Sequence, residues 1–207
     1  MRGNKNAKQL TLTFDDGPSF TSKKIIKILD KYSCKATFFW LGSNLSNHID
    51  ALNQAIENGH VIGNHSWDHT NLGNYEAERF WIEQIDRTNK EFERLTGDKM
   101  IYYRPPFGNV SNDQITFLKE KNIKTVLWTV STIDWDERQN SCNQITNRVM
   151  GNLNPGTIIL LHDFDSVDNP DAGSNRRGML LALKRIIKKC KALGYEFVTI
   201  ETLINSK

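Results

Sequence analysis

The segment GTIILLH, residues 156–162, is the clearest indication of the fold in this sequence. Five β-branched or apolar residues follow Gly156 without a break, and His162 ends the run. A short run without alternating polar residues is typical of a strand buried on both faces, as in a parallel sheet covered by helices. At the carboxyl ends of such strands the following loops build the active site, so His162 stands where function is expected.

Short β-rich runs of this kind recur along the chain, mostly separated by amphipathic stretches. The seven predicted strands cover residues 9–14 (QLTLTF), 35–40 (KATFFW), 60–65 (HVIGNH), 99–104 (KMIYYR), 124–130 (KTVLWTV), 156–162 (GTIILLH) and 195–200 (YEFVTI). The predicted helices cover Thr21–Tyr32, Ile49–Asn58, Glu76–Leu95, Asn112–Lys121, Asn143–Leu153 and Arg177–Leu193. This alternation predicts the α/β class with a parallel sheet, either open and doubly wound or closed into a barrel. Turn-forming residues from Asp163 to Asn175 predict a loop.

Length and composition favour a single soluble globular domain. The 207 residues are enough for one substantial core, which we place at residues 9–203 after a short polar extension over residues 1–8. No stretch approaches the roughly 18 apolar residues that a membrane helix needs, so we expect no transmembrane span. With 27 basic and 24 acidic residues spread along the chain, the net charge is only +3, and we expect no nucleic-acid partner. We expect the protein to be a monomer.

Cysteine usage and the N-terminus say little about the compartment in which the protein works. Cys34, Cys142 and Cys190 lack the short pairing spacing of a zinc knuckle or a redox pair, so we expect packed or free thiols. The first nine residues, MRGNKNAKQ, are polar and contain no apolar segment of a secretory signal. The sequence as given therefore predicts no signal peptide, and localisation stays open.

Charged and polar residues gather at the carboxyl ends of the predicted strands. They are Asp15 and Asp16 after the first strand, His65 after the third, Arg104 after the fourth, Asp134 after the fifth and His162 at the end of the sixth. Polar surface residues without a function would be distributed over both ends of the strands. In a parallel barrel these ends share one face, so the residues are predicted to converge on a single site.

Two histidines four residues apart, His65 and His69 in HSWDH, indicate a metal site. At this spacing they would lie on one face of a helical turn, near enough to bind one ion. One carboxylate from the adjacent pair Asp15 and Asp16 completes a set of two His and one Asp, which leaves coordination positions open for water and substrate. The metal charge would offset the repulsion between the two acids and let the second acid stay ionised as a base.

Each of these motifs alone has a simpler interpretation. A lone pair of histidines at this spacing is as often solvated or packed in a core. The sequence DDG by itself is a favourable turn, because Asp and Gly are common in turns. The catalytic interpretation rests on the occurrence of both motifs together.

Five ordered motifs make the chain resemble the polysaccharide deacetylases of carbohydrate esterase family four, which carry a NodB-homology domain. The motifs are TFDDGP, HSWDH, RPPFG, the IDW of STIDW, and LLHD, and the resemblance extends over residues 9–203. It implies a distorted (β/α) barrel, commonly with seven strands, and the metal-dependent removal of acetyl groups from N-acetylated sugars. The sequence pattern also predicts seven strands.

The resemblance implies a role for each matching residue. Asp15 resembles the general base and Arg104 the residue that holds it, while Asp16, His65 and His69 resemble the metal ligands. His162 resembles the general acid, Asp134 the carboxylate that orients and charges it, and Phe107 the residue whose backbone N–H donates to the oxyanion. Trp135 and Leu160 resemble the walls of a small apolar slot for the acetyl methyl group. One departure is Ser131, three residues before Asp134, where family members often carry a further acid. This departure affects the wall of the slot rather than the presence of Asp134.

The resemblance also implies one divalent metal as cofactor. We expect zinc, and cobalt or nickel would satisfy the same two nitrogens and one oxygen. The expected substrate is an N-acetylglucosamine-containing polysaccharide, either peptidoglycan or a chitin-type oligomer, and a cell-wall substrate would place the protein in the envelope or outside the cell. Two other functions stay open, an O-acetyl esterase acting on xylan and a saccharide-binding protein without turnover. An amidohydrolase that opens small cyclic ureides is disfavoured by the short chain.

Other residues near the motifs are expected to have structural roles. We expect Trp40, Trp81 and Trp128 in the core, His48 and His60 as structural histidines, and Asp68, Asp163 and Asp165 as loop acids or acids behind the site. Trp67 lies between the two histidines of HSWDH and fits either core packing or stacking on a sugar ring.

Overall fold

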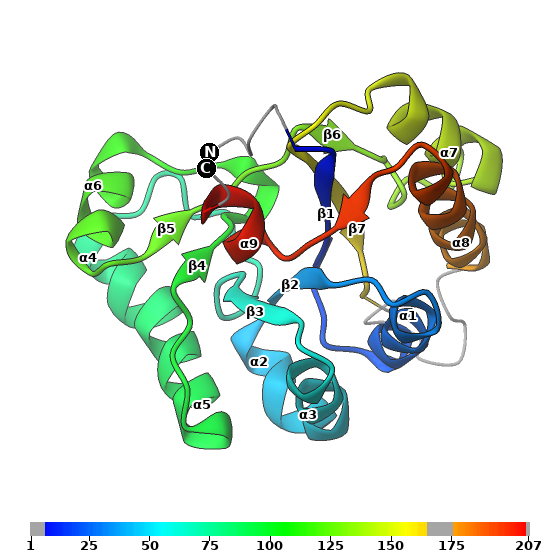
Figure 1. The fold of residues 1–207 in the computed structure, drawn as a ribbon. Coiled ribbons are helices and arrows are strands. Elements are labelled where there is room, and N and C mark those ends of the chain that lie inside the picture. Colours follow the sequence, from blue (N-terminus) through cyan, green and yellow to red (C-terminus); the bar gives the residue numbers. More distant parts are fainter. Residues whose placement is uncertain (1–6, 165–175, 206–207) are drawn as a thin grey trace.

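The computed structural model describes residues 7–164 and 176–205 (Figure 1). Most of the loop predicted at residues 163–175, including Asp165, lies outside the described residues. Within the described part of the chain, none of the helices is both long enough and apolar enough to cross a membrane.

The strands form one sheet in which every pairing is parallel. They are β1 (Gln9–Asp15), β2 (Ala36–Trp40), β3 (Val61–Asn64), β4 (Tyr102–Tyr103), β5 (Lys124–Thr125), β6 (Val130–Ser131), β7 (Thr157–His162) and β8 (Glu196–Phe197). The order is β5-β4-β3-β2-β1-β7-β6, and β8 pairs with the start of β1. The longest strands, β1 and β7, lie side by side with Asp15 opposite His162. The first and last sequence motifs therefore meet at the carboxyl end of the sheet.

The predicted strand at residues 124–130 is wrong as a continuous element. It divides into β5, which pairs with β4, and β6, which pairs with β7 at the opposite end of the sheet. Backbone bonding continues on both sides of the break, from the Val126 N–H to the Tyr103 carbonyl (2.8 Å) and from the Thr129 N–H to the Ile158 carbonyl (2.9 Å). One segment thus joins both edges of the sheet, and the distorted (β/α) barrel predicted from the sequence is confirmed.

Most of the helices lie around the outside of the sheet, whereas the short α9 (Ile200–Asn205) packs in a second apolar cluster with Phe39 and Tyr102 (Figure 1). The helices are α1 (Phe20–Lys31), α2 (Gly42–Leu45), η1 (Ser46–His48), α3 (Ile49–Glu57), α4 (Ala77–Phe80), η2 (Trp81–Asp86), α5 (Arg87–Thr96), η3 (Pro106–Gly108), α6 (Asn112–Glu120), α7 (Cys142–Gly151), α8 (Arg177–Ala192) and α9. Five of the six predicted helices are confirmed to within two residues. The sixth, Glu76–Leu95, divides into α4, the π-helical stretch η2 and α5. The short helices α2 and α9 were not predicted, and α9 begins where the predicted strand at 195–200 would have ended.

Serines begin three of these helices at the carboxyl end of the barrel. Ser19, Ser111 and Ser141 precede α1, α6 and α7, and each accepts a hydrogen bond from a backbone N–H of the first turn. In all three cases a side chain in that turn bonds back to the serine N–H, which completes a capping box. Such a cap typically stabilises a helix by about 1 kcal/mol. The caps fix where the chain turns from strand end into helix.

Strand β1 separates the main apolar core from the interior of the barrel. Leu10, Leu12 and Phe14 are fully buried and pack with helix residues in the main core. Thr13 and Asp15 are also buried, but they alternate with the apolar residues and so face the other side of the sheet. Burying one leucine or phenylalanine side chain stabilises the fold by roughly 1.5–3 kcal/mol, which helps to offset the cost of burying polar groups on the opposite face.

Several residues expected to be structural lie in this core. Trp40, Cys34 and Cys190 are buried in it, as predicted. His60 is buried as well, and its Nδ1 accepts a hydrogen bond from the Ala36 N–H (3.2 Å). Burial lowers the pKa of His60 to about 4, so the ring is neutral at neutral pH.

Candidate active site

Asp15, the last residue of β1, is held by Arg104, which follows β4. Nη1 of Arg104 donates to Asp15 Oδ1 (2.7 Å) and to Thr13 Oγ1 (2.7 Å). Both charged side chains are almost completely buried, so water screens their attraction only weakly. The permanently charged guanidinium offsets the repulsion between Asp15 and Asp16, and its planar shape fixes the direction of the Asp15 carboxylate.

Arg104 also bridges the break between β5 and β6. Its Nε donates to the Val126 carbonyl and its Nη2 to the Leu127 carbonyl, both at 3.3 Å. The guanidinium lies over the ring of Phe39, 4.2 Å from the ring centroid. The side chain that holds the candidate base therefore also supplies backbone carbonyls with donors where the sheet is interrupted.

Asp16 occupies a left-handed turn directly after β1. Its φ of 80° is unusual for a residue other than glycine. The Asp16 N–H donates to the Phe39 carbonyl (3.2 Å), and Asn44 Nδ2 donates to the Asp16 carbonyl (3.3 Å). Consecutive residues of a strand face opposite sides, but this turn lets Asp15 and Asp16 line the same cavity.

The segment HSWDH does not form the helical turn that its spacing predicted. It is a loop after β3 in which Ser66 and His69 have φ values of 74° and 64°. Asn64 Oδ1 accepts from the Ser66 N–H (2.8 Å), and Ser66 Oγ accepts from the His69 N–H (3.1 Å). These bonds shape the loop, and the rings of His65 and His69 still lie 5.2 Å apart between centroids.

Asp16, His65 and His69 bring three possible metal ligands together. Asp16 Oδ1 lies 3.2 Å from His65 Nε2 and 3.3 Å from His69 Nε2, and the three atoms lie within 4.8 Å of one another. His65 Nδ1 lies 2.7 Å from the Arg104 carbonyl oxygen, which can only accept, so in the neutral ring Nε2 keeps its lone pair. Asp16 Oδ1 is buried and accepts no hydrogen bond among the described residues. This donor set fits a divalent cation with open coordination positions.

The charges of this set also suit a cation. Burial alone would raise the pKa of the Asp16 carboxyl, but the neighbouring His65 imidazole, 3.2 Å away, holds it well below its usual range. Burial lowers the pKa of His65, and the carboxylates of Asp15 and Asp16 outweigh that effect and raise it. A proton and a metal ion compete for the same histidine nitrogen, so metal affinity should fall as the solution becomes more acidic.

His162 and Asp134 form a second charged pair across the cavity. His162 Nδ1 lies 2.8 Å from Asp134 Oδ1, and the His162 N–H donates to Asp134 Oδ2 (3.0 Å). Thr132 Oγ1 also donates to the Asp134 carboxylate (3.0 Å). Burial by itself lowers the pKa of His162, but the charge and hydrogen bond of Asp134 raise it to about 9. The ring is therefore protonated at neutral pH, with Nε2 as the nitrogen that Asp134 does not use.

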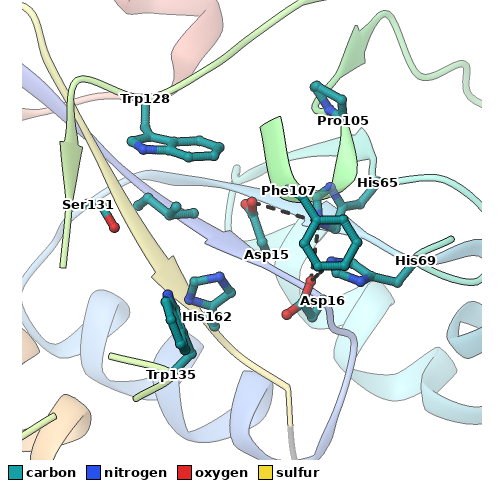
Figure 2. Close-up of a pocket in the computed structure, with 11 residues that line it drawn as sticks. Asp15, Asp16, His65, His69, Pro105, Phe107, Trp128, Ser131, Trp135 and His162 are labelled. Carbon is teal, nitrogen blue, oxygen red and sulfur yellow. Dashed lines mark ion pairs between the residues drawn. The ribbon is translucent and has the colours of Figure 1, made fainter. Parts of the chain in front are cut away.

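A single cavity of about 470 Å³ joins these groups (Figure 2). Its lining residues are Asp15, Asp16, His65, His69, Pro105, Phe107, Trp128, Ser131, Trp135, Leu160 and His162. Eight of the ten residues singled out from the sequence line it, and the other two, Arg104 and Asp134, contact Asp15 and His162 from behind. The side chains of Phe107 and Trp135 are 66% and 59% exposed, so they stand at its open side.

The structure corrects or completes the sequence prediction for three residues near the cavity. Trp128, expected in the core, is only half-buried and lines the cavity, because the break between β5 and β6 releases it from the sheet. Trp67 does not line the cavity; its ring stacks under Arg87, 3.8 Å from the guanidinium carbon. Asp163, expected as a loop acid or an acid behind the site, is fully buried. The LLHD motif contains Asp163, but neither its partners nor the position of Trp128 can be predicted from local sequence, since both depend on distant contacts.

Comparison with known proteins agrees with this geometry. The sequence profile of the family described as polysaccharide deacetylase matches residues 2–140, more than half of the chain. The chain belongs to this family. The carbohydrate esterase family four resemblance inferred from the five motifs is thereby confirmed.

Individual members of the polysaccharide deacetylase family align over most of the chain. A peptidoglycan-N-acetylglucosamine deacetylase of Bacillus cereus is 35% identical over 202 residues, which cover 97% of this chain and 70% of that relative. The chain spans 40% of a longer relative, the peptidoglycan-N-acetylglucosamine deacetylase PgdA of Listeria monocytogenes, at 33% identity over 98% of this chain.

Solved structures of the family superpose closely. The crystal structure of the Bc1960 peptidoglycan N-acetylglucosamine deacetylase has a TM-score of 0.90 at 34% identity, and the match covers 100% of this chain and 92% of that one. BA3943 of Bacillus anthracis, described as a family-four pseudoenzyme, has a TM-score of 0.86 at 28% identity, with 100% and 68% of the two chains covered. Because the family includes a pseudoenzyme, the fold alone does not establish catalysis, and the residues of the site must carry that argument.

Proposed function

We propose that the protein removes N-acetyl groups from N-acetylglucosamine-containing polysaccharide and releases acetate, using one divalent metal ion. The observation that carries this proposal is the arrangement of one cavity between two charged groups, the set of Asp16, His65 and His69 on one side and the protonated His162 on the other. Hydrolysis of an acetamide needs help at both ends, because water is a weak nucleophile and an amine is a poor leaving group unless it is protonated. The names of the relatives favour peptidoglycan as the polymer.

Asp16, His65 and His69 would hold the metal, and we expect zinc. A divalent ion there supplies a Lewis acid that polarises the acetyl carbonyl and makes water more acidic. Asp15 accepts the proton from the attacking water, because its carboxylate lines the same cavity and is kept in one orientation by Arg104. The backbone N–H of Phe107 donates to the oxyanion that develops on the carbonyl oxygen, a contact worth roughly 3 to 4 kcal/mol in typical enzymes.

His162 donates the second proton, from Nε2 to the leaving amine. Asp134 holds Nδ1 and keeps the ring charged, so the donor is ready at neutral pH. Trp135 and Leu160 would enclose the acetyl methyl group between them, which excludes water from that side of the carbonyl. Trp128 and Ser131 line the same part of the cavity, and a serine in place of an acid leaves this wall without an additional negative charge.

Acetate release from N-acetylglucosamine oligomers and from peptidoglycan tests the proposal. Metal-stripped protein would be assayed with and without added Zn²⁺, Co²⁺ or Ni²⁺, with Asp15→Asn and His65→Ala as variants. Acetate that forms only with metal and is lost in both variants supports the proposed reaction. Acetate released from acetyl-xylan but not from the amide substrates would favour the esterase instead. Metal binding without acetate from any substrate would indicate a saccharide-binding protein.

A further inference from the structure

Asp163, directly after the candidate acid His162, is a fully buried carboxylate with no part in the proposed reaction. It accepts hydrogen bonds from the Gly17 N–H (3.0 Å), Ser22 Oγ (2.6 Å) and Trp40 Nε1 (2.8 Å). Burial raises the pKa of Asp163 to about 7, and these three donors oppose that rise. Burying an acid is costly even when it is hydrogen-bonded to neutral groups, so its position needs an explanation.

The contacts of Asp163 lie on both sides of Asp16. The Asp163 N–H donates to the Asp15 carbonyl (3.0 Å) and continues the β1–β7 pairing by one residue. Its carboxylate holds the N–H of Gly17. Asp163 therefore bonds to the residue before Asp16 and to the residue after it, at the turn where Asp16 adopts a left-handed conformation.

Gly17 and Asp163 fit together so closely that no other residue could replace the glycine without a shift. A Cβ atom on Gly17 would lie 2.5 Å from Asp163 Oδ2 and 2.6 Å from Trp40 Nε1. The glycine of TFDDGP is thus required by this contact, in addition to the general preference of turns for glycine. The carbonyl of Asp163 also accepts a hydrogen bond from Ser19 Oγ, the residue that caps α1.

We propose that Asp163 is a positioning residue that fixes the metal ligand Asp16 relative to the proton donor His162, an inference that rests on the proposed function. His162 and Asp163 are consecutive, so one short stretch carries the proton donor and also bonds to both sides of Asp16. A left-handed conformation is unfavourable for an L-residue other than glycine, so this turn should relax when its hydrogen bonds are lost. The Asp16 carboxylate would then move away from His65 and His69.

The variant Asp163→Asn tests this role because it keeps the shape of the side chain but replaces one acceptor oxygen with an amide donor. Zn²⁺ affinity would be measured by competition with a chelating dye, and the Co²⁺-loaded protein by its visible absorption spectrum. We expect Zn²⁺ affinity to fall about 10- to 100-fold and the Co²⁺ spectrum to change. At saturating metal we expect kcat on N-acetylglucosamine oligomers to fall while KM stays close to its wild-type value.

Ile186→Ala is the matched control. Ile186 is fully buried in the main core on α8, so the variant loses stability without removing any hydrogen bond of the turn. Its metal affinity, Co²⁺ spectrum and kcat should equal those of the wild type. If they fall as far as in Asp163→Asn, general destabilisation accounts for both variants and the positioning role is refuted.

Two milder variants keep the proposal testable if Asp163→Asn does not fold. Trp40→Phe and Ser22→Ala each remove one donor to the carboxylate and leave the Gly17 bond in place. We expect each to weaken Zn²⁺ affinity in the same direction by about threefold, as for the loss of one hydrogen bond to Asp163. Ser22→Ala also removes the acceptor of the Ser19 N–H in the α1 capping box, so Trp40→Phe is the cleaner variant. Wild-type affinity, spectrum and kcat in folded Asp163→Asn, or otherwise in both milder variants, would overturn the proposal.

The metal measurements separate this inference from the proposed function because they need no turnover. Wild-type protein that binds metal but releases no acetate would refute the deacetylase, while the affinity and spectrum of Asp163→Asn would still decide the positioning role. Wild-type protein that binds neither Zn²⁺ nor Co²⁺ would overturn both.

Discussion

One wall of the cavity is a network of buried charged groups, whereas the opposite wall is mostly apolar (Figure 2). On the first wall, Asp16 pairs with His65 and His69. Arg104, behind this wall, bonds to Asp15 through its side chain and to His65 through its carbonyl oxygen. On the second, Trp128, Ser131, Trp135 and Leu160 lie around His162, which pairs with Asp134, and Arg176 Nη1 lies 3.6 Å from the same carboxylate. We therefore expect a substitution on the charged wall to disturb its neighbours, and a substitution on the apolar wall to have a local effect.

The largest effects are expected on the charged wall, where two variants should separate metal binding from proton transfer. His65→Ala removes a ligand, so we expect loss of metal and a fall in kcat of about 10³-fold or more. Asp15→Asn should lower kcat by about 10²- to 10⁴-fold but leave the three ligands in place. Isothermal titration with Zn²⁺ and acetate release are the measurements. Equal metal affinity in wild type and His65→Ala would refute the assigned ligand set.

The ionic pair of the apolar wall should show itself in the pH profile. His162 acts as an acid only when protonated, so activity should be present below its pKa of about 9 and fall as the pH rises through that value. In Asp134→Asn the ring loses the charge that raises its pKa, and burial favours the neutral form. We therefore expect the alkaline limb to move toward lower pH, with kcat reduced and Zn²⁺ affinity kept. A limb that stays in place would show that another group controls it.

A smaller effect is expected for Trp135→Ala. Its side chain is largely exposed and forms no ionic contact with the charged wall, so we expect a folded protein with unchanged Zn²⁺ affinity. Loss of one aromatic wall of the acetyl slot should raise KM about tenfold, which corresponds to ~1.4 kcal/mol. Initial rates over a range of oligomer concentrations measure this. A change in metal affinity would contradict the independence of the two walls.

The smallest effect on catalysis is expected at His60, which lies outside both walls. Its pKa is lowered to about 4 in the folded protein, against 6.5 for an unperturbed histidine. Between pH 4 and 6.5, His60 is therefore protonated in the unfolded chain but neutral in the folded protein. Stability from neutral His60 is fully present above pH 6.5 and is lost as the pH falls toward 4, by about 3 kcal/mol in all. His60→Gln should reduce this dependence and leave kcat at pH 7 unchanged. Urea unfolding of both proteins at pH 4.5 and 7 is the measurement, and identical pH dependence would contradict it.

The class of the fold and the residues of the candidate site could be predicted from the amino-acid sequence. Apolar runs such as 156–162 and the helical periods between them are local patterns, and local patterns report secondary structure directly. The convergence of the polar residues could also be predicted, because the carboxyl ends of parallel strands in a barrel all lie on one face. Ten residues chosen in this way, with the family resemblance, surround or support one cavity.

The contacts that hold these residues in place could not be predicted from the sequence. The break between β5 and β6 places the half-buried Trp128 on the cavity wall, and the loop of HSWDH has two left-handed residues where a helical turn was predicted. Asp163 gains its place through a hydrogen bond to Gly17, 146 positions away in the chain. Such features depend on partners that are distant in sequence and become neighbours only after folding, so no local pattern can reveal them.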